Sequence, residues 1–398
     1  MTDWGTCAVS NSFVKSKVGR KNQIPAKGIS ETGSFPIIDQ GQDFIAGYCD
    51  DENKLIDFEL PLIIFGDHTR CFKYVDFPFV LGADGTKVLA PKKEIYDPKF
   101  YYFALISLEL PTRGYNRHFK MLKERSLPLP PLSEQKKIAH ILSTVQQAIE
   151  EQERIIQTTT ELKKALMQKL FTEGLRGEPQ KQTEIGPIPE SWKVVPLEQK
   201  AESFQYGTST KCGYESDGKP VLRIPNIIGG HVDITDLKFG KLKKSELGKL
   251  TLHAGDLLFV RTNGVKENAG RCSLFNNELD DCYYASYLIR VRLYPKILNP
   301  SFLNEYTRTE VGTSFLSGRS IRTADGKFNI NSGTLKTMLV PVPTIDEQNE
   351  IAQSLKFIEM KAAHAYTKKA NLQDLFRSLI HGLMTAKIRV NEISPNIN

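Results

Sequence analysis

The feature that most constrains this chain is a short segment that occurs twice. "LPPLSEQKKIAHIL" runs from Leu129 to Leu142, and "VPTIDEQNEIAQSL" runs from Val342 to Leu355. Prolines, a Glu-Gln pair and apolar residues match at a constant offset of 213 residues, as Gln135 matches Gln348. A repeat at about half the chain length predicts an internally duplicated fold, a pseudo-dimer within one polypeptide.

A long amphipathic helix is expected after each copy of the repeat. The prolines disfavour helix in the residues that precede them, and Ser133 and Asp346 are expected to cap the helix starts with their side-chain oxygens. Each helix should span about 40 residues, or about 60 Å at 1.5 Å per residue. Apolar positions then alternate in steps of three and four, the spacing of a coiled-coil seam, so we expect the two helices to pack on each other. The expected seam is Ile138, Ile141, Val145, Ala148, Gln152, Ile155, Thr159, Leu162 and Leu166 in the first copy, and Ile351, Leu355, Ile358, Ala362, Ala365, Lys369, Leu372, Phe376, Leu379 and Leu383 in the second.

The helices divide the chain into four parts. Strand-rich domains are expected at residues 1–128 and 179–341, and helical segments at 129–178 and 342–398, the last with a tail. Apolar runs that end in polar, Gly-containing loops, such as "LPLIIFGDHTR" and "GDLLFVRTNG", predict strands in both domains. The plan is therefore domain, helix, domain, helix.

Composition allows this plan and leaves several partners open. The 398 residues are 40% hydrophobic and 25% charged, which is ordinary for globular chains and sufficient for two or more domains. A net charge of +7 suits a polyanion but does not establish one. Scattered cysteines without zinc-site spacing, a start unlike a signal peptide and the lack of long apolar runs predict a cytoplasmic protein without a membrane span.

The sequence contains none of the common catalytic motifs. "GYESDGKP" (Gly213–Pro220) has the glycines and lysine of a phosphate loop, but Pro220 stands where Ser or Thr would bind magnesium, so we interpret it as a turn. Zinc-protease, nucleophile-elbow, kinase and dinucleotide patterns are not found. We therefore expect no enzymatic activity, no catalytic residue and no metal site.

Polar and basic side chains gather instead on loops at the ends of the predicted strands. Such side chains can reach base edges and phosphates. For any one residue a solvated loop is the simpler interpretation, but one such set in each of two similar domains favours DNA binding. The candidate DNA-binding residues are His68, Thr69, Arg70, Lys73, Arg113, Tyr115, Arg117 and His118 in the first domain, and Lys211, Arg223, Arg261, Asn263, Lys266, Asn268, Arg271, Arg319, Arg322 and Lys327 in the second.

The chain resembles the specificity subunit of type I restriction-modification systems. The resemblance is carried by the two Glu-Gln segments, by "IGPIPESW" before the second domain, and by "GDHTRCFKYVDFPFVLGADG" and "GDLLFVRTNG", and it covers nearly the whole chain. It implies an α+β fold with two strand-rich α/β target recognition domains. A long antiparallel two-helix coiled coil would separate them, and the whole would have an internal pseudo-two-fold repeat.

The resemblance also implies a function and partners. Each recognition domain would read one half of a split double-stranded DNA target, while the paired helices set the spacing and dock two modification subunits. Restriction subunits with nuclease and translocase activity are further expected partners. The chain itself would need no cofactor, because S-adenosylmethionine, ATP and magnesium are used by partner subunits. One departure is visible: Trp4 opens the first domain without the "IGPIP" prefix of the second, so the tail after Leu383 is expected to contribute there.

Two other functions remain open at the level of sequence. The chain could be a stand-alone bivalent DNA-binding regulator, or a coiled-coil adaptor without DNA contact. Stable association with modification subunits distinguishes a specificity subunit from a regulator. Specific DNA binding that persists in salt excludes the adaptor.

Overall fold

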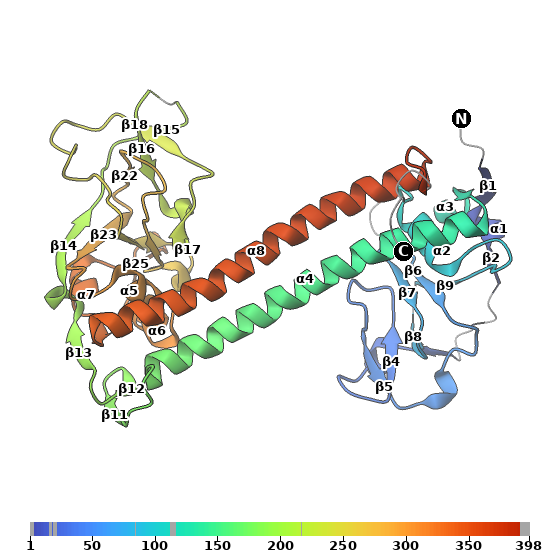
Figure 1. The fold of residues 1–398 in the computed structure, drawn as a ribbon, viewed down its shortest axis with the longest axis horizontal. Helices are drawn as coiled ribbons and strands as arrows, with labels where there is room; N and C mark the ends of the chain where they lie inside the picture. Colours follow the sequence, from blue (N-terminus) through green and yellow to red (C-terminus); the bar gives the residue numbers. More distant parts are fainter. Residues whose placement is uncertain are drawn as a thin grey trace. The chain divides into compact units, whose positions relative to one another are not determined.

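The computed structural model describes residues 4–15, 18, 22–83, 85–111, 117–215 and 217–390. The chain forms two compact units (Figure 1), with residues 1–154 and 366–398 in unit 1 and residues 155–365 in unit 2. The two long helices, α4 (Leu132–Glu173) and α8 (Ile345–Met384), each contribute one part to unit 1 and the other part to unit 2. Helices and strands are thus mixed in both units, as the α+β prediction requires.

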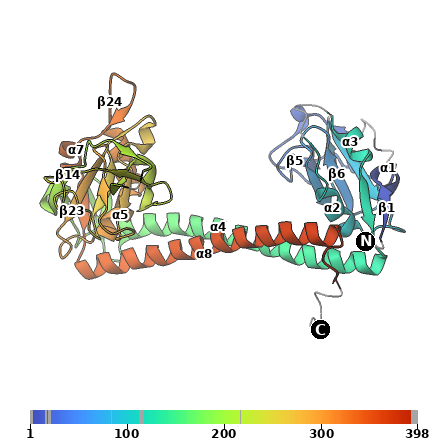
Figure 2. The ribbon, with the colours of Figure 1, turned by 90° about the horizontal axis from the view of Figure 1, so that it is seen from above.

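The helices α4 and α8 lie side by side and run antiparallel within each unit (Figure 2). Pairs of interacting residues show the direction, because higher residue numbers on α4 meet lower numbers on α8. In unit 1 the pairs are Glu134–Arg389 (3.6 Å, Arg389 lying just beyond α8) and Glu153–Lys369 (2.8 Å). In unit 2 they are the Lys163–Glu359 ion pair (3.3 Å) and a hydrogen bond from the Leu175 N–H to Glu347 (3.1 Å). Leu175 lies just beyond the end of α4.

The predicted seam is confirmed for α8 and partly wrong for α4. Every predicted seam residue of α8 is buried or half-buried. On α4, however, Ile155 is 39% and Leu162 is 53% exposed, while the neighbouring Ile156 and Lys163 are turned inward. Lys163, which is not a residue of the expected seam, pairs with buried Glu305 (3.2 Å).

The predicted helix caps are wrong by two residues. The helices begin at Leu132 and Ile345, so Ser133 and Asp346 lie within the first turn rather than at the cap position. At the start of α8 the hydroxyl of Thr344 accepts a hydrogen bond from the Glu347 N–H (3.4 Å), which is the role of a helix cap.

The described residues of unit 1 form two four-stranded sheets and one strand pair. The sheets have the orders β2-β9-β6-β7 and β3-β8-β4-β5, and β1 pairs with β10. The central strand β6 is buried along its whole length, and α2 and the long helices pack against the main core. The bounds are β1 Gly5–Ala8, α1 Val9–Ser12, β2 Phe13–Val14, β3 Gln23–Ile24, β4 Phe35–Ile38, β5 Gly47–Cys49, β6 Leu62–Gly66, β7 Phe72–Val75, β8 Val80–Gly82, β9 Thr86–Pro91, α2 Pro98–Ile106, α3 Phe119–Lys123 and β10 Ser126–Leu129.

Unit 2 repeats this plan and extends it. Its sheets have the orders β14-β23-β19-β21-β17, β15-β18-β16-β22 and β20-β25-β24, with the pairs β11-β12 and β13-β26. The bounds are β11 Gln180–Thr183, β12 Gly186–Pro189, β13 Lys193–Pro196, β14 Ala201–Tyr206, β15 Cys212–Gly213, β16 Lys219–Leu222, β17 Ile227–Val232, β18 Lys238–Gly240, β19 Leu257–Val260, β20 Thr262–Asn263, β21 Cys272–Leu274, β22 Tyr283–Tyr284, β23 Leu288–Leu293, α5 Pro300–Thr307, α6 Glu310–Gly318, β24 Ile321–Arg322, β25 Phe328–Asn329, α7 Ser332–Lys336 and β26 Leu339–Val342.

The Glu-Gln pair of the repeat attaches each long helix to its unit in the same way. The buried amide of Gln135 accepts the Asp97 N–H (2.8 Å) and donates to two backbone carbonyls, those of Ile95 (2.8 Å) and Pro130 (2.9 Å). In unit 2 the matching contacts of Gln348 are to the Asn299 N–H (2.7 Å), Ile297 (3.1 Å) and Pro343 (3.0 Å). Each glutamine thereby ties the start of a long helix to the N-cap residue of α2 or α5.

The glutamate beside each glutamine binds the tryptophan that precedes most strands of its unit. The Trp4 indole N–H donates to Glu134 (3.1 Å), and the Trp192 indole N–H donates to Glu347 (3.2 Å). The duplication inferred from sequence is therefore repeated as a set of equivalent hydrogen bonds, each made within one unit.

The C-terminal segment completes unit 1, as the missing prefix suggested. Val390 is buried in the core of this unit, and the Arg389 guanidinium lies 5.2 Å from the centre of the Trp4 ring. In unit 2 the "IGPIP" segment instead forms the turn and strand β12 that precede Trp192. Residues 391–398 of the tail lie outside the described residues.

Candidate nucleic-acid interface

In unit 2 the structure joins two loops that the sequence presented separately. The short strand β20, in the loop after central strand β19, pairs with β25, and β25 pairs in turn with β24. The Arg261 carbonyl also accepts the Ile330 N–H (2.8 Å). Candidate residues near 261–271 and near 319–327 therefore belong to one surface built on a small three-stranded sheet.

Arg261 is held at the base of this surface. Its guanidinium lies over the Tyr206 ring at 4.9 Å and donates to the Ser286 carbonyl (3.5 Å). Its backbone N–H donates to the carbonyl of Tyr287 (2.8 Å), whose side chain is 57% exposed. A cation beside exposed aromatic rings is an arrangement that can bind phosphates and stack on bases.

The other candidate residues of this surface differ in their exposure to solvent. Lys266, Arg319, Arg322 and Lys327 are exposed. Asn263, Asn268 and Arg271 are half-buried: Asn263 accepts the Val265 N–H (2.9 Å), and Arg271 donates to the Asn268 side chain. The half-buried residues shape the loop, while the exposed ones face solvent.

Lys211 and Arg223 lie on a different sheet of unit 2. Lys211 is exposed next to β15, whereas Arg223 follows β16 and pairs with Asp236 (2.9 Å). Near them the Lys238 ammonium lies 4.6 Å from the centre of the Tyr214 ring, and Tyr214 is highly exposed. This is a second, smaller basic and aromatic surface of the unit.

Unit 1 also brings two loops together, through the buried carboxylate of Asp67. Asp67 follows central strand β6, and its side chain accepts the Phe119 N–H (2.7 Å). The Asp67 backbone carbonyl accepts the His118 N–H (2.9 Å) and lies 3.0 Å from the His118 ring nitrogen Nδ1. His118 is buried, whereas the adjacent Arg117 is exposed. The β6–β7 turn is thereby bound to the segment that leads into α3.

The candidates in the β6–β7 turn are mostly engaged within unit 1. Arg70, at φ 64°, donates to the Leu110 carbonyl (2.8 Å), and Thr69 and His68 bond to Gln40. Lys73 is buried, where it pairs with Asp39 (3.4 Å) and donates to the Asp43 carbonyl (2.5 Å). Arg113 and Tyr115 lie outside the described residues.

The two units thus present the same arrangement, in which the loop after the central strand meets the segment before a short helix. These are β6 and α3 in unit 1, and β19 and α7 in unit 2. Sequence reasoning missed Asp67, Tyr206 and Ile321. Asp67 could have been suspected from "GDHTR", but the positions of Tyr206 and Ile321 depend on strand pairings that no local pattern reveals.

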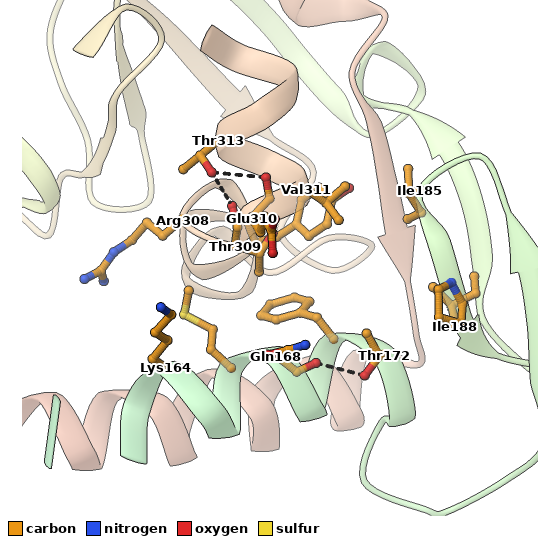
Figure 3. A pocket seen from close by; sticks show the side chains of 14 residues that line it. Lys164, Gln168, Thr172, Ile185, Ile188, Arg308, Thr309, Glu310, Val311 and Thr313 are labelled. Carbon is orange, nitrogen blue, oxygen red and sulfur yellow. Dashed lines mark hydrogen bonds between the residues drawn. The ribbon is translucent and has the colours of Figure 1, made fainter. Parts of the chain in front are cut away.

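A cavity of about 530 Å³ lies within unit 2, between α4, the β11–β12 hairpin and α5–α6 (Figure 3). Met167, Phe171 and Val311 make it largely apolar, and Lys164 lines it from α4. The hydroxyls of two lining threonines are bonded to carbonyls of their own helices, Thr172 to Gln168 (2.9 Å) and Thr313 to Thr309 (2.8 Å). The lining offers an apolar contact surface rather than an acid–base pair.

Within the described ranges, no cluster of three or more His, Cys, Asp or Glu side chains is arranged to hold a metal ion. Over the same ranges, no helix has both the length and the apolar character needed to cross a membrane.

Comparison with known proteins agrees with this geometry. A family model described as the type I restriction modification DNA specificity domain matches residues 13–159. The specificity subunit of type I restriction enzyme EcoKI from Escherichia coli (strain K12) is 27% identical over an alignment of 320 residues, and the match covers 76% of this chain and 68% of that protein. The MjaVIII specificity subunit from Methanocaldococcus jannaschii is 27% identical over 322 residues, 77% and 74% of the two chains.

Solved structures share the fold. A type I restriction-modification S subunit from M. genitalium has a TM-score of 0.63 at 16% identity, covering 100% of this chain and 97% of that chain. A chain from a structure of the assembly and conformational transition of the type I R-M system has a TM-score of 0.51, also at 16% identity, covering 96% and 97%. Together with the repeated Glu-Gln attachment and the paired loops of each unit, these comparisons show that the chain is similar to type I restriction-modification specificity subunits and shares the fold of a solved S subunit.

Proposed function

We propose that this chain is the non-catalytic DNA sequence-recognition subunit of a type I restriction-modification complex. The observation that carries the proposal is the paired-loop surface that occurs in both units and displays arginines and lysines. One recognition surface in each of two diverged units suits a split, asymmetric double-stranded target, much as dimers read two half-sites. The assigned recognition domains are residues 1–128 and 179–341.

The residues proposed to contact DNA follow from their exposure. In unit 2 they are the exposed Lys211, Lys266, Arg319, Arg322 and Lys327 together with Arg261 at the base of the main surface. In unit 1 the exposed Arg117 is retained, and Arg113 and Tyr115 stay predictions from sequence. Buried Lys73 and His118 are proposed to support the loops, because each is bonded to neighbouring backbone and shielded from solvent.

The partners are proposed from the similarity to type I specificity subunits. The helical segments 129–178 and 342–398 would dock two modification subunits and set the distance between the half-sites, and restriction subunits would join the assembly. Methyl transfer from S-adenosylmethionine and cleavage driven by ATP and magnesium would take place on these partner chains in the cytoplasm. The chain alone would neither methylate nor cut DNA.

The test is to express the full chain with and without its cognate modification subunits and to sequence modified bases in the host genome. We expect a two-part methylated motif that requires both components, and stable co-purification of the chain with the modification subunits. Methylation that does not depend on the chain would overturn the proposal. Specific DNA binding without any association with modification subunits would instead indicate the stand-alone regulator.

A further inference from the structure

The hairpin formed by β24 and β25 projects from the body of unit 2 (Figure 2). Both residues of β24 are exposed, so neither face of this strand is packed on the unit. Ile321 is 64% exposed, which is unusual for a large apolar side chain on a strand. A strand with both faces in solvent and an isoleucine on one of them is suited to contact something outside the chain.

The charges of the hairpin indicate a polyanion. Arg319 and Arg322 flank Ile321, and no carboxylate in the described part of the chain forms an ion pair with either. The only acidic side chain of the hairpin, Asp325, is already paired with Lys327 (2.9 Å). Hydrogen bonds from Thr323 and Lys327 lower the pKa of Asp325 to about 2, so it stays ionised and engaged at neutral pH.

The hairpin is also ordered before it meets a partner. The Thr323 N–H donates to the Lys327 carbonyl (2.7 Å), which closes the turn. At the base, β25 pairs with β20, and the following Ile330 is buried. Little conformational freedom would be lost on binding, which favours affinity.

A two-stranded ribbon of this kind fits the major groove of B-DNA, which is about 12 Å wide. There the C5 methyl of thymine is the group that an apolar side chain can recognise, while arginines bind guanine edges or phosphates. An acidic protein surface would satisfy the arginines but gives no reason for an isoleucine between them.

We propose that the β24–β25 hairpin enters the major groove of the half-site read by unit 2, with Ile321 against a thymine methyl and with Arg319 and Arg322 on adjacent bases or phosphates. The inference rests on the proposed function and deepens it, since it assigns sequence discrimination to one named side chain. It gives no role to the hairpin in reading the other half-site.

The experiment compares binding of the full chain, assembled with its modification subunits, to two versions of its methylation target. One contains thymine and the other contains deoxyuridine throughout the half-site of unit 2, which removes only the methyl groups. We expect the wild type to bind the thymine DNA about 3- to 10-fold more tightly, as is typical for burying one methyl group. Ile321→Ala should bind both DNAs equally and resemble the wild type on deoxyuridine.

A matched control and a second variant make the outcomes decisive. Ile297→Ala removes an isoleucine that is 45% exposed beside Gln348, and it should keep the thymine preference. Arg322→Ala should weaken binding to the same half-site and leave the other half-site preference unchanged, with an unaltered melting temperature.

Unchanged discrimination in Ile321→Ala and Arg322→Ala would overturn the inference and leave the proposed function intact. Loss of a modification subunit from these variants, with DNA discrimination retained, would show that the hairpin docks protein instead. Absence of specific binding by the wild type would overturn the proposed function itself.

Discussion

At the scale of single residues, one buried glutamine in each unit binds three backbone groups. Gln348 has no exposed surface, accepts the Asn299 N–H and donates to the Ile297 and Pro343 carbonyls. Gln348→Glu keeps the acceptor and removes both donors, which leaves two carbonyls unpaired and introduces a buried acid. We expect a loss of about 2–4 kcal/mol in the stability of unit 2. Hydrogen exchange at the first turn of α5 measures it locally.

The neighbouring exposed glutamine of the same helix supplies the control. Gln353→Glu should change stability by about 0.5 kcal/mol or less, because its side chain faces solvent. Gln135→Glu should reproduce the loss in unit 1, at the first turn of α2. Equal protection from hydrogen exchange in Gln348→Glu and the wild type would mean that the hydrogen bonds donated by the Gln348 amide are unimportant for holding the helix start.

The importance of this residue could be predicted from the sequence, but its contacts could not. The repetition of Glu-Gln at an offset of 213 residues marks the pair as significant. The partners of Gln135 lie at Ile95 and Asp97, far from it in sequence, and become neighbours only when the unit folds. For the same reason the burial of Lys73 and His118 was not visible in loops that look polar and exposed.

At the scale of elements, equivalent positions of the two units use different chemistry. Lys163 lies 28 residues after Gln135, and Phe376 lies 28 residues after Gln348. In unit 2 Lys163 pairs with Glu305 of α5 (3.2 Å), whereas in unit 1 Phe376 contacts Phe103 of α2 edge-on, with ring centres 6.0 Å apart. At this equivalent position the contact is thus ionic in unit 2 and aromatic in unit 1.

Removing the ionic contact should weaken unit 2 selectively. Lys163 and Arg308 both pair with Glu305 and with Glu359, so Lys163→Met leaves two carboxylates with one cation. We expect a loss of about 1–3 kcal/mol, between the values for exposed and buried ion pairs. Protection of α5 amides from hydrogen exchange should fall, with that of α2 unchanged. Lys164→Met, one residue along and exposed, serves as the control; the same fall there would exclude a specific role for Lys163.

The same ion cluster predicts a dependence on pH. Burial raises the pKa of Glu359, but the facing Arg308 and Lys163 outweigh burial, and its pKa is lowered below the ordinary value of 4.5. A lowered folded-state pKa stabilises the fold above the unfolded value, and this contribution disappears as the pH falls through the folded value. Protection of α5 should therefore decline below about pH 4.5, and Glu359→Gln should flatten that decline. An identical acid profile in wild type and Glu359→Gln would contradict the role of this cluster.

Periodicity was sufficient to predict the long helices but not every side chain on their seam. Both helices and nearly all of the α8 seam were predicted, because apolar spacing alone determines them. The α4 seam shifts by one residue at Ile155, where a second isoleucine follows, and a lysine takes the inward position. The β20–β25–β24 sheet was missed because its strands are two residues long and β20 lies far in sequence from the other two.

At the scale of the whole molecule, only α4 and α8 carry the chain from one unit to the other. The two crossing points are Arg154–Ile155 on α4 and Ala365–Tyr366 on α8. Each lies between the Glu153–Lys369 pair of unit 1 and the Lys163–Glu359 pair of unit 2, so insertions there leave both pairs intact. If each unit reads one half-site, the helical connection would determine the length of the unread spacer.

Inserting one heptad into both helices at these crossing points tests whether the helices set the distance between the half-sites. Seven residues preserve a seam that repeats every 3.5 residues and add about 10 Å of helix. Since B-DNA rises about 3.4 Å per base pair, we expect unchanged half-sites with a spacer longer by about three base pairs. Three base pairs also rotate the far half-site by about 100°, so the DNA or the helices must twist and methylation should be slower. Sequencing the methylated sites of the extended chain with its modification subunits gives the spacer.

An insertion into α4 alone is the control and should abolish methylation, because it displaces one seam against the other. Efficient methylation at the original spacer by the doubly extended chain would show that the helices do not set the distance.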